Sequence, residues 1–254
     1  MEASSEVSVA FAFEVLNGGG ETLRGVFDTR GVSPSTCPPF PDAVVLCHGF
    51  RSSRRSRALT AISESLALPT VAFDFSGNGN SGGEFQYGNY AKEVEDLRSI
   101  VEWVQERGYR TKGILGHSKG GNVVLLYGAK YDDVDRIVNL SGRCSLTTGV
   151  IERIGKEGLE KIQRDGYVDM DGYKITSAGL RERLTTDMSQ IEQIRNANVL
   201  HVHGSADEVS PASEAAELQK QTPGSKLKVV EGADHSFSNH RDDLIKAVIP
   251  FLEG

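Results

Sequence analysis

Short apolar runs alternate with amphipathic segments along most of the chain. The apolar runs fall at residues 43–47, 70–73, 113–115, 137–140, 199–202 and 227–230. Helical periodicity fills the intervals at about 54–67, 89–107, 119–130, 211–221 and 239–252. A short continuous apolar run is typical of a strand that is buried on both faces of a parallel sheet. The alternation therefore predicts right-handed strand–helix–strand crossovers and a mostly parallel sheet with helices on both faces.

Two segments depart from this rhythm. The start of the chain predicts an antiparallel hairpin, with strands at 7–15 and 22–27 joined by a turn. Residues 143–190 are charged, dotted with glycine and only partly helical, at 150–164 and 178–186. We expect a small lid here, over the carboxyl ends of the strands where open α/β sheets bind ligands; an ordinary long crossover is the alternative. With no repeat or second domain evident, residues 1–254 are predicted to form one domain that contains the 143–190 insertion.

The strongest chemical signal lies between an apolar run and the helix predicted to follow it. There the chain reads Gly116-His117-Ser118-Lys119-Gly120, which matches the pattern G-x-S-x-G. A sharp strand-to-helix turn lifts the serine hydroxyl clear of the sheet, and small residues on either side avoid clashes with the backbone. The helix that follows directs its N–H groups and the positive end of its dipole toward the same point. Ser118 is therefore the predicted nucleophile, and an incidental serine in a glycine-rich turn is the alternative.

A serine hydroxyl needs a base, and the base needs an orienting carboxylate. Two later loops offer these residue types in the order Ser, acid, His that this elbow motif favours. Asp207 follows the apolar run at 199–202, and His235 follows the run at 227–230. Both loops leave carboxyl ends of predicted parallel strands, on the side of the sheet where Ser118 is expected. Asp207 and His235 are therefore the predicted acid and base, with Glu208 and Asp234 as weaker rivals of Asp207.

The oxyanion formed by attack on a carbonyl needs two hydrogen-bond donors. One is expected to be the N–H of Lys119, directly after the nucleophile. The other is expected from the loop after the first long parallel strand, where we choose the N–H of Phe50. Gly49 would let that backbone come close, and His48 would shape the loop without acting as a second base.

The remaining candidate motifs predict no metal and no cofactor. His117 is expected to point away from the nucleophile, and His201 and His203 share one face of a strand without a third ligand nearby. Residues 77–82 contain G-x-G-x-x-G, the fingerprint of dinucleotide sites. That fingerprint requires a helix to open at once, and here residues 83–88 delay it.

Composition and charge narrow the class of protein further. The chain has 254 residues, 38% of them apolar and 25% charged, and a formal charge of −7, which disfavours a nucleic-acid partner. Three cysteines at no metal-like spacing favour a reducing compartment. The N-terminus lacks the features of a signal peptide, and no apolar stretch approaches the ~20 residues that span a bilayer. A cytoplasmic protein is expected. The sequence does not predict the oligomeric state.

One local basic cluster runs against the negative net charge. Arg51, Arg54, Arg55 and Arg57 fall within seven residues, next to the loop that carries Phe50. The solvated face of a helix explains such a cluster. Attraction of an anionic substrate is the functional alternative, with Arg51 as the candidate substrate-binding residue.

Several of these motifs together resemble a known family. The segments are 48–50, 74–83, 116–121 and 232–237. They look like α/β-hydrolases of the serine aminopeptidase S33 group, and within it like the cinnamoyl (feruloyl) esterases. The resemblance runs from about residue 43 to the C-terminus and is poor across 143–190.

The resemblance implies a carboxylesterase with the triad Ser118–Asp207–His235. It also implies an oxyanion hole from Phe50 and Lys119, and an insertion that shapes acyl specificity. Two positions depart from the family pattern. Asn78 stands where a histidine is frequent, and Lys119 replaces the more frequent Gln or Met, which adds positive charge near the site.

Two classes of function remain open from sequence. The first is a serine carboxylesterase for small-molecule esters, including hydroxycinnamoyl or other aryl and acyl esters, working through an acyl-enzyme. The second is a non-hydrolytic small-molecule receptor on the same fold, since fold does not determine function. A lyase, peptidase or acyltransferase with the same triad is a further possibility.

Overall fold

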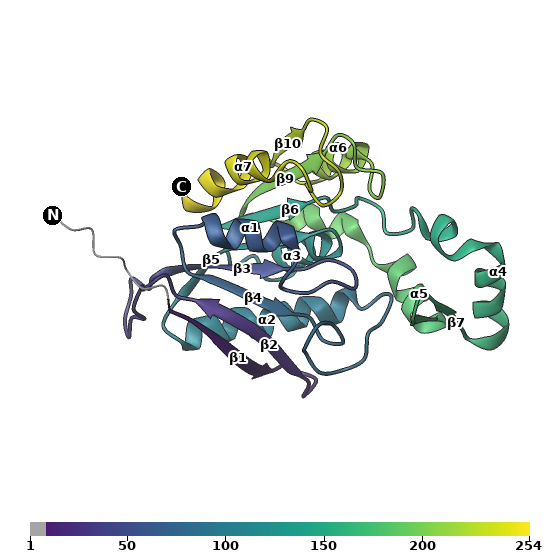
Figure 1. The fold of residues 1–254 in the computed structure, drawn as a ribbon, viewed down its shortest axis with the longest axis horizontal. Coiled ribbons are helices and arrows are strands. Elements are labelled where there is room, and N and C mark those ends of the chain that lie inside the picture. Colours follow the sequence, from purple (N-terminus) through teal and green to yellow (C-terminus); the bar gives the residue numbers. More distant parts are fainter. Residues whose placement is uncertain (1–8) are drawn as a thin grey trace.

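The computed structural model describes residues 9–254 and contains a central eight-stranded sheet (Figure 1). The strands run in the spatial order β1-β2-β4-β3-β5-β6-β9-β10. Their bounds are β1 (Ala10–Leu16), β2 (Thr22–Asp28), β3 (Asp42–Cys47), β4 (Thr70–Asp74), β5 (Arg110–His117), β6 (Arg136–Leu140), β9 (Asn198–Gly204) and β10 (Lys226–Val230). The six strands from β4 to β10 in this order pair in parallel, whereas β1 pairs with β2, and β2 with β4, antiparallel. The predicted α/β fold with an antiparallel N-terminal hairpin is confirmed.

The N-terminal hairpin joins the sheet through one aromatic residue of its first strand. Phe13 is the buried residue of β1, and its ring stacks on Trp103 with centroids 4.2 Å apart. Residues 1–8 lie outside the described part of the chain, and with them the beginning of the strand predicted at 7–15 and the segment compared with a signal peptide.

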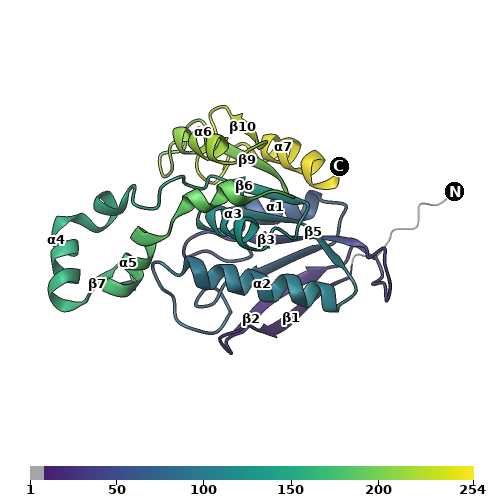
Figure 2. The same ribbon diagram turned by 180° about the vertical axis from the view of Figure 1, so that it is seen from behind.

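Helices cover both faces of the sheet (Figures 1 and 2). They are α1 (Arg57–Ser65), α2 (Tyr90–Glu106), α3 (Lys119–Tyr131), α6 (Ala212–Gln221) and α7 (Arg241–Glu253). The apolar core forms two clusters, one between the sheet and α2, α3 and α6, and the other between the sheet and α1 and α7. Burial of apolar side chains on both faces explains why the central strands read as continuous apolar runs.

The first helix begins three residues later than the periodicity predicted. Arg54 belongs to the loop before α1, where its N–H donates to Asp74 Oδ1 at 2.7 Å and its guanidinium pairs with the same buried carboxylate. The basic cluster is therefore not one face of a helix, because only Arg57 of its four arginines lies in α1. Paired with Asp74, Arg54 ties this loop to the end of β4.

The segment between β6 and β9 projects from one end of the sheet (Figures 1 and 2). It contains α4 (Val150–Asp165), β7 (Tyr167–Met170), β8 (Tyr173–Thr176), α5 (Ser177–Thr185) and a 3-10 helix, η1 (Met188–Gln193). The two helices match the predicted ones, and the β7–β8 hairpin was not predicted. It turns at Asp171-Gly172, a dipeptide that favours a tight hairpin turn because both residues adopt positive φ. Apolar side chains from the helices and the hairpin of this segment form a small cluster that includes Tyr87 and packs against Phe50.

Candidate active site

Ser118 occupies a sharp turn between β5 and α3. Its φ and ψ are 56° and −118°, a backbone conformation that non-glycine residues rarely adopt. Its N–H donates to the carbonyl of Leu140 at 2.7 Å. A Cβ on Gly116 would overlap the carbonyl oxygen of Gly120, and a Cβ on Gly120 would overlap that of His48. Both positions therefore require glycine, and the tightly closed turn holds the Ser118 side chain at the carboxyl end of β5.

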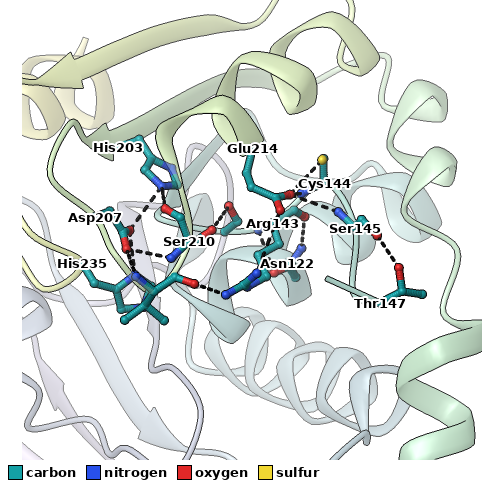
Figure 3. Close-up of polar contacts among 12 residues, drawn as sticks. Asn122, Arg143, Cys144, Ser145, Thr147, His203, Asp207, Ser210, Glu214 and His235 are labelled. Atoms are coloured by element: carbon teal, nitrogen blue, oxygen red, sulfur yellow. Dashed lines mark hydrogen bonds and ion pairs between the residues drawn. The ribbon is translucent and has the colours of Figure 1, made fainter. Parts of the chain in front are cut away.

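The loops after β9 and β10 bring Asp207 and His235 to the same point. His235 Nε2 lies 2.9 Å from Ser118 Oγ, and His235 Nδ1 lies 2.7 Å from Asp207 Oδ2 (Figure 3 draws the second contact). In this geometry Ser118 Oγ–H donates to Nε2, and Nδ1–H donates to the carboxylate. The three residues selected from chain order thus form one continuous row of hydrogen bonds.

Asp207 is held as an ionised carboxylate. Its side chain is fully buried, and Oδ1 accepts the N–H groups of Val209 and Ser210 at 2.8 and 2.7 Å. Although burial by itself raises the pKa of Asp207, hydrogen bonds from His203, His235 and the Ser210 N–H hold that pKa below its ordinary value. A permanently charged oxygen therefore faces His235 Nδ1 near neutral pH.

The rival carboxylates lie elsewhere. Glu208 is exposed, and Asp234 is also exposed and accepts the N–H groups of Ser236 and Ser238 at 3.2 and 2.8 Å. Asp234 therefore shapes the loop that carries His235 and does not contact the imidazole.

Four histidines outside this row, His48, His117, His201 and His203, are buried. His48 Nε2 accepts the N–H of Phe75 at 3.0 Å, so its imidazole joins the loops after β3 and β4. His203 Nε2 lies 2.6 Å from Ser210 O and 3.2 Å from Asp207 Oδ2 (Figure 3). His203 therefore helps to fix the position of the Asp207 carboxylate. Among the described residues, no three His, Cys, Asp or Glu side chains cluster as metal ligands would.

His117 has a contact that the sequence did not suggest. Its Nε2–H donates to the backbone carbonyl of His235 at 2.8 Å, and the two imidazoles lie 5.1 Å apart between centroids. Burial lowers the pKa of His117 to about 4, and the neighbouring His235 lowers it too. A neutral His117 thus fixes the backbone of the loop that carries His235.

The loop after β3 lies directly against the nucleophile. A Cβ on Gly49 would sit 3.1 Å from Ser118 Cβ and 3.0 Å from the carbonyl oxygen of His117. Gly49 therefore permits a close approach, as expected. The backbone N–H groups of Phe50 and Lys119 donate to no acceptor within residues 9–254. Two donors beside Ser118 are thus available to a bound oxygen.

Comparison with known proteins shows which family the chain belongs to. Residues 39–199 match the family described as serine aminopeptidase, S33, and this stretch is more than half of the chain. The chain belongs to the serine aminopeptidase S33 family. The matched stretch includes Ser118 and ends before Asp207 and His235.

Relatives of this S33-family chain include a lipase and a lipase homolog. Monoacylglycerol lipase of Mycolicibacterium smegmatis is 28% identical over 251 residues, which cover 85% of this chain and 88% of the relative. A monoglyceride lipase homolog of monkeypox virus is 23% identical over 247 residues, covering 84% and 89%. The predicted enzyme class is confirmed, and the chain is a serine hydrolase of the esterase and lipase class.

Solved structures show the same fold. Est1E from Butyrivibrio proteoclasticus, with ferulic acid bound, superposes with a TM-score of 0.80 at 24% identity, covering 95% of this chain and 98% of that one. An esterase of Pyrococcus furiosus gives a TM-score of 0.72 at 18% identity, covering 100% and 93%. No helix in the described part of this S33-family chain is long and apolar enough to cross a membrane.

The positive charge that Lys119 adds near the site is buried and paired with a carboxylate. Lys119 Nζ lies 2.6 Å from Glu93 Oε1 on α2, and both side chains are 4% exposed. Burial raises the pKa of Glu93 to about 7, against the opposing effect of Lys119. The Lys119 side chain therefore ties the start of α3 to α2.

Two clefts meet at Ser118. The first, here called the arginine cleft, shares Phe50 and Ser118 with the second and continues over Tyr90, Lys119, Arg143, Arg153 and Arg183. The second, the histidine cleft, is lined by Arg51, His117, His235 and Ser238 in addition to the shared Phe50 and Ser118.

Arg51 reaches the hairpin of the insertion from its place beside the histidine cleft. Its guanidinium donates to the carbonyl of Asp171 at 3.0 Å and lies 4.5 Å from the centroid of the Tyr173 ring. The sequence did not predict that Arg143, Arg153 and Arg183 line the arginine cleft, because these residues lie far apart along the chain and share no motif.

Proposed function

We propose that the chain is a carboxylesterase in which Ser118 attacks the ester carbonyl, His235 is the general base and Asp207 orients the imidazole. The observation that carries this proposal is the row of hydrogen bonds from Ser118 Oγ through His235 to Asp207, at 2.9 and 2.7 Å. Asp207 accepts Nδ1–H and so leaves Nε2 free to take the hydroxyl proton.

The reaction proceeds in two halves. In the first, Ser118 Oγ bonds to the acyl carbon while its proton passes to His235 Nε2. Collapse of the tetrahedral intermediate breaks the bond to the alcohol, and His235 returns the proton to the leaving oxygen. In the second half, water attacks the acyl-enzyme with the same base, releasing the acid and restoring Ser118.

The oxyanion is assigned to the N–H groups of Phe50 and Lys119. The close approach of Gly49 to Ser118 and the lack of other acceptors for these donors in the described chain support this assignment. Preformed backbone donors stabilise the charge that develops on the carbonyl oxygen without reorganisation.

Residues 143–190 are proposed to act as a lid within a single domain of residues 1–254. The packing of Phe50 supports this role, because its ring lies edge-on to Tyr173 of the hairpin and to Tyr87, with centroids 5.6 and 5.7 Å apart. The insertion thus contacts the loop that is proposed to supply an oxyanion donor.

The substrates are proposed to be small-molecule esters. Hydroxycinnamoyl esters are one candidate, because the family likeness points to feruloyl esterases and the solved relative Est1E binds ferulic acid. Acylglycerols are another, from the names of the lipase relatives. Arg51 lines the histidine cleft and is proposed as a contact for the alcohol part that is secondary to its contacts with Asp171 and Tyr173 of the insertion.

Labelling with a fluorophosphonate probe, followed by steady-state hydrolysis of 4-nitrophenyl butyrate, tests the proposal. We expect the wild type to be labelled and to turn over many times. Ser118→Ala should lose both properties and keep its circular dichroism spectrum. Ser238→Ala, at the rim of the same cleft, is the control and should be labelled. Undiminished turnover in Ser118→Ala would refute the assignment.

The same assay distinguishes a carboxylesterase from a receptor or an acyltransferase with the same fold. A receptor would give at most one turnover. An acyltransferase would convert the ester faster when a competing alcohol is added and would form a new ester. Hydrolysis to free acid in many turnovers is the result that the carboxylesterase proposal requires.

A further inference from the structure

The arginine cleft lies on the acyl side of the nucleophile. The leaving alcohol must take its proton from His235 Nε2, so the alcohol lies on the side of the imidazole. His235 lines the histidine cleft and does not line the arginine cleft. The acyl chain is bonded to the same carbonyl carbon as the alcohol oxygen and points away from His235. It therefore enters the arginine cleft.

Three arginines from separate elements converge on that cleft. Arg143 follows β6, Arg153 belongs to α4, and Arg183 belongs to α5. Like charges brought together in a partly buried site repel one another unless an anion lies between them. Burial lowers the pKa of Arg143, and despite Glu214 the positive charges of Arg183 and Arg153 add to this effect.

Two of these guanidinium groups have no carboxylate partner in the described part of the chain. Neither Arg153 nor Arg183 forms an ion pair with any residue from 9 to 254. Arg183 Nη1 donates to the hydroxyl of Tyr90 at 2.8 Å, and its Nε is buried without a hydrogen-bond partner. The Arg153 guanidinium lies 4.9 Å from the centroid of the Phe50 ring. Both cations are therefore positioned by aromatic residues and keep donors for a ligand.

Arg143 is anchored at the base of the cleft. Its guanidinium donates to the carbonyl of Val209 and lies 3.9 Å from Glu214 Oε1 (Figure 3 shows Arg143 beside Glu214). Glu214 Oε2 is itself occupied by the N–H groups of Cys144 and Ser145, at 2.8 and 3.3 Å. Glu214 thus compensates Arg143 only in part.

The other nearby carboxylates are occupied as well. Glu93 pairs with Lys119 beneath the cleft. Glu182, next to Arg183 in α5, accepts the N–H groups of Asn89 and Ala91. The cleft therefore keeps an excess of positive charge after its own acidic residues have been counted.

We propose that this enzyme hydrolyses esters whose acyl chain ends in a carboxylate, that is, half-esters of dicarboxylic acids. This inference rests on the proposed function, because it places the acyl group by the roles of Ser118 and His235. Guanidinium groups bind carboxylates through paired, charge-assisted hydrogen bonds. The Tyr90 hydroxyl accepts from Arg183 and so keeps its own proton to donate to the same carboxylate.

Matched substrates test this directly. Mono(4-nitrophenyl) adipate, pimelate and suberate are compared with the methyl esters of the same compounds, which keep the chain and lack the charge. Hydrogen bonds to charged groups contribute about 1.5–3 kcal/mol, which converts to a preference in kcat/KM on the order of 10- to 100-fold for the acid. This preference should shrink as sodium chloride is raised.

Variants assign the preference to the cleft. Arg183→Met and Arg153→Met should each reduce the ratio of kcat/KM between the acid and its methyl ester by about 10-fold. Arg181→Met is the matched control, because Arg181 is exposed on the same helix and should leave both the ratio and the activity unchanged. Adipate should inhibit hydrolysis of 4-nitrophenyl butyrate competitively, and adipamide should not, which tests the site without a variant.

The outcomes separate this inference from the proposed function. If neutral esters are hydrolysed with no preference for any of the three acids, only the proposal of an anionic acyl group is overturned. The same holds if the methyl esters of these acids, or methyl ferulate, are hydrolysed faster. Failure to hydrolyse any ester, neutral or charged, would overturn the esterase itself.

Discussion

Lys119 Nζ and Glu93 Oε1 lie 2.6 Å apart in a buried ion pair directly behind the nucleophile. Lys119 is the first residue of α3, and its backbone N–H is a proposed oxyanion donor. The pair therefore links the position of that donor to α2, and the Lys119 ammonium also lies 5.0 Å from the centroid of the Tyr90 ring.

Breaking this pair from one side is expected to destabilise the fold. Lys119→Met leaves Glu93 buried without its cation, so the free energy of unfolding should fall by about 3–5 kcal/mol. The double variant Lys119→Met/Glu93→Gln removes both charges and should recover most of that loss. Urea unfolding at pH 7 measures both. A single variant as stable as the wild type would contradict this interpretation.

Asp207→Asn tests which carboxylate orients the imidazole. Asparagine cannot accept Nδ1–H in the same way while it binds the N–H groups of Val209 and Ser210, so the wrong tautomer of His235 is favoured. The kcat for an aryl ester should drop by about 10⁴-fold. Asp234→Asn and Glu208→Gln, at the rival carboxylates, should stay within about 3-fold of the wild type if Asp207 alone orients the imidazole.

The turn around Ser118 should not tolerate a side chain at its glycines. In Gly120→Ala the new Cβ would overlap the carbonyl oxygens of His48 and Cys47. The strain should lower the free energy of unfolding by at least about 1–3 kcal/mol. Gly18→Ala is the control, because a Cβ there meets no atom within 4 Å. Equal thermal stability of the two variants would show that the turn can relax.

Stability should fall as the pH drops from about 6.5 to about 4. Burial lowers the pKa values of His48, His117 and His201 to about 4, from an ordinary value of 6.5. The unfolded chain therefore binds protons in this window that the folded chain does not, and each imidazole contributes a slope of up to about 1.4 kcal/mol per pH unit. The stabilisation is complete above pH 6.5 and is lost toward pH 4.

One histidine can be isolated in this titration. His201→Gln should show a shallower loss of unfolding free energy between pH 6.5 and 4.5 than the wild type. His240→Gln, at the partly exposed start of α7, should follow the wild-type curve. Parallel curves for the wild type and His201→Gln would contradict the role of His201.

Arg51→Met distinguishes a contact to the insertion from a contact to substrate. If Arg51 mainly holds Asp171 and Tyr173, its loss should speed limited proteolysis within 165–176 several-fold. If Arg51 binds the alcohol part, KM for aryl esters should rise with no change in proteolysis. We expect the first effect to dominate, because the guanidinium already donates to Asp171 O and lies over an aromatic ring.

The apolar runs and their helical intervals were sufficient to predict the sheet and its main helices. The central runs reflect strands buried on both faces, whereas the last run forms the largely exposed edge strand β10, and such patterns are local to the chain. The nucleophile turn was predictable for the same reason, since Gly116, Ser118 and Gly120 lie within five residues. Asp207 and His235 could be selected because the ends of parallel strands meet at one edge of a sheet.

Only the tertiary structure decided how charge is distributed around that edge. The Lys119–Glu93 pair joins two helices, so nothing next to Lys119 in sequence shows that its charge is buried and compensated. Arg143, Arg153 and Arg183 come from a loop and two helices of the insertion, and they converge only because the insertion packs against Phe50 and Tyr87. Local patterns encode strands, helices and turns, whereas the lining of the acyl cleft depends on contacts between segments distant in sequence.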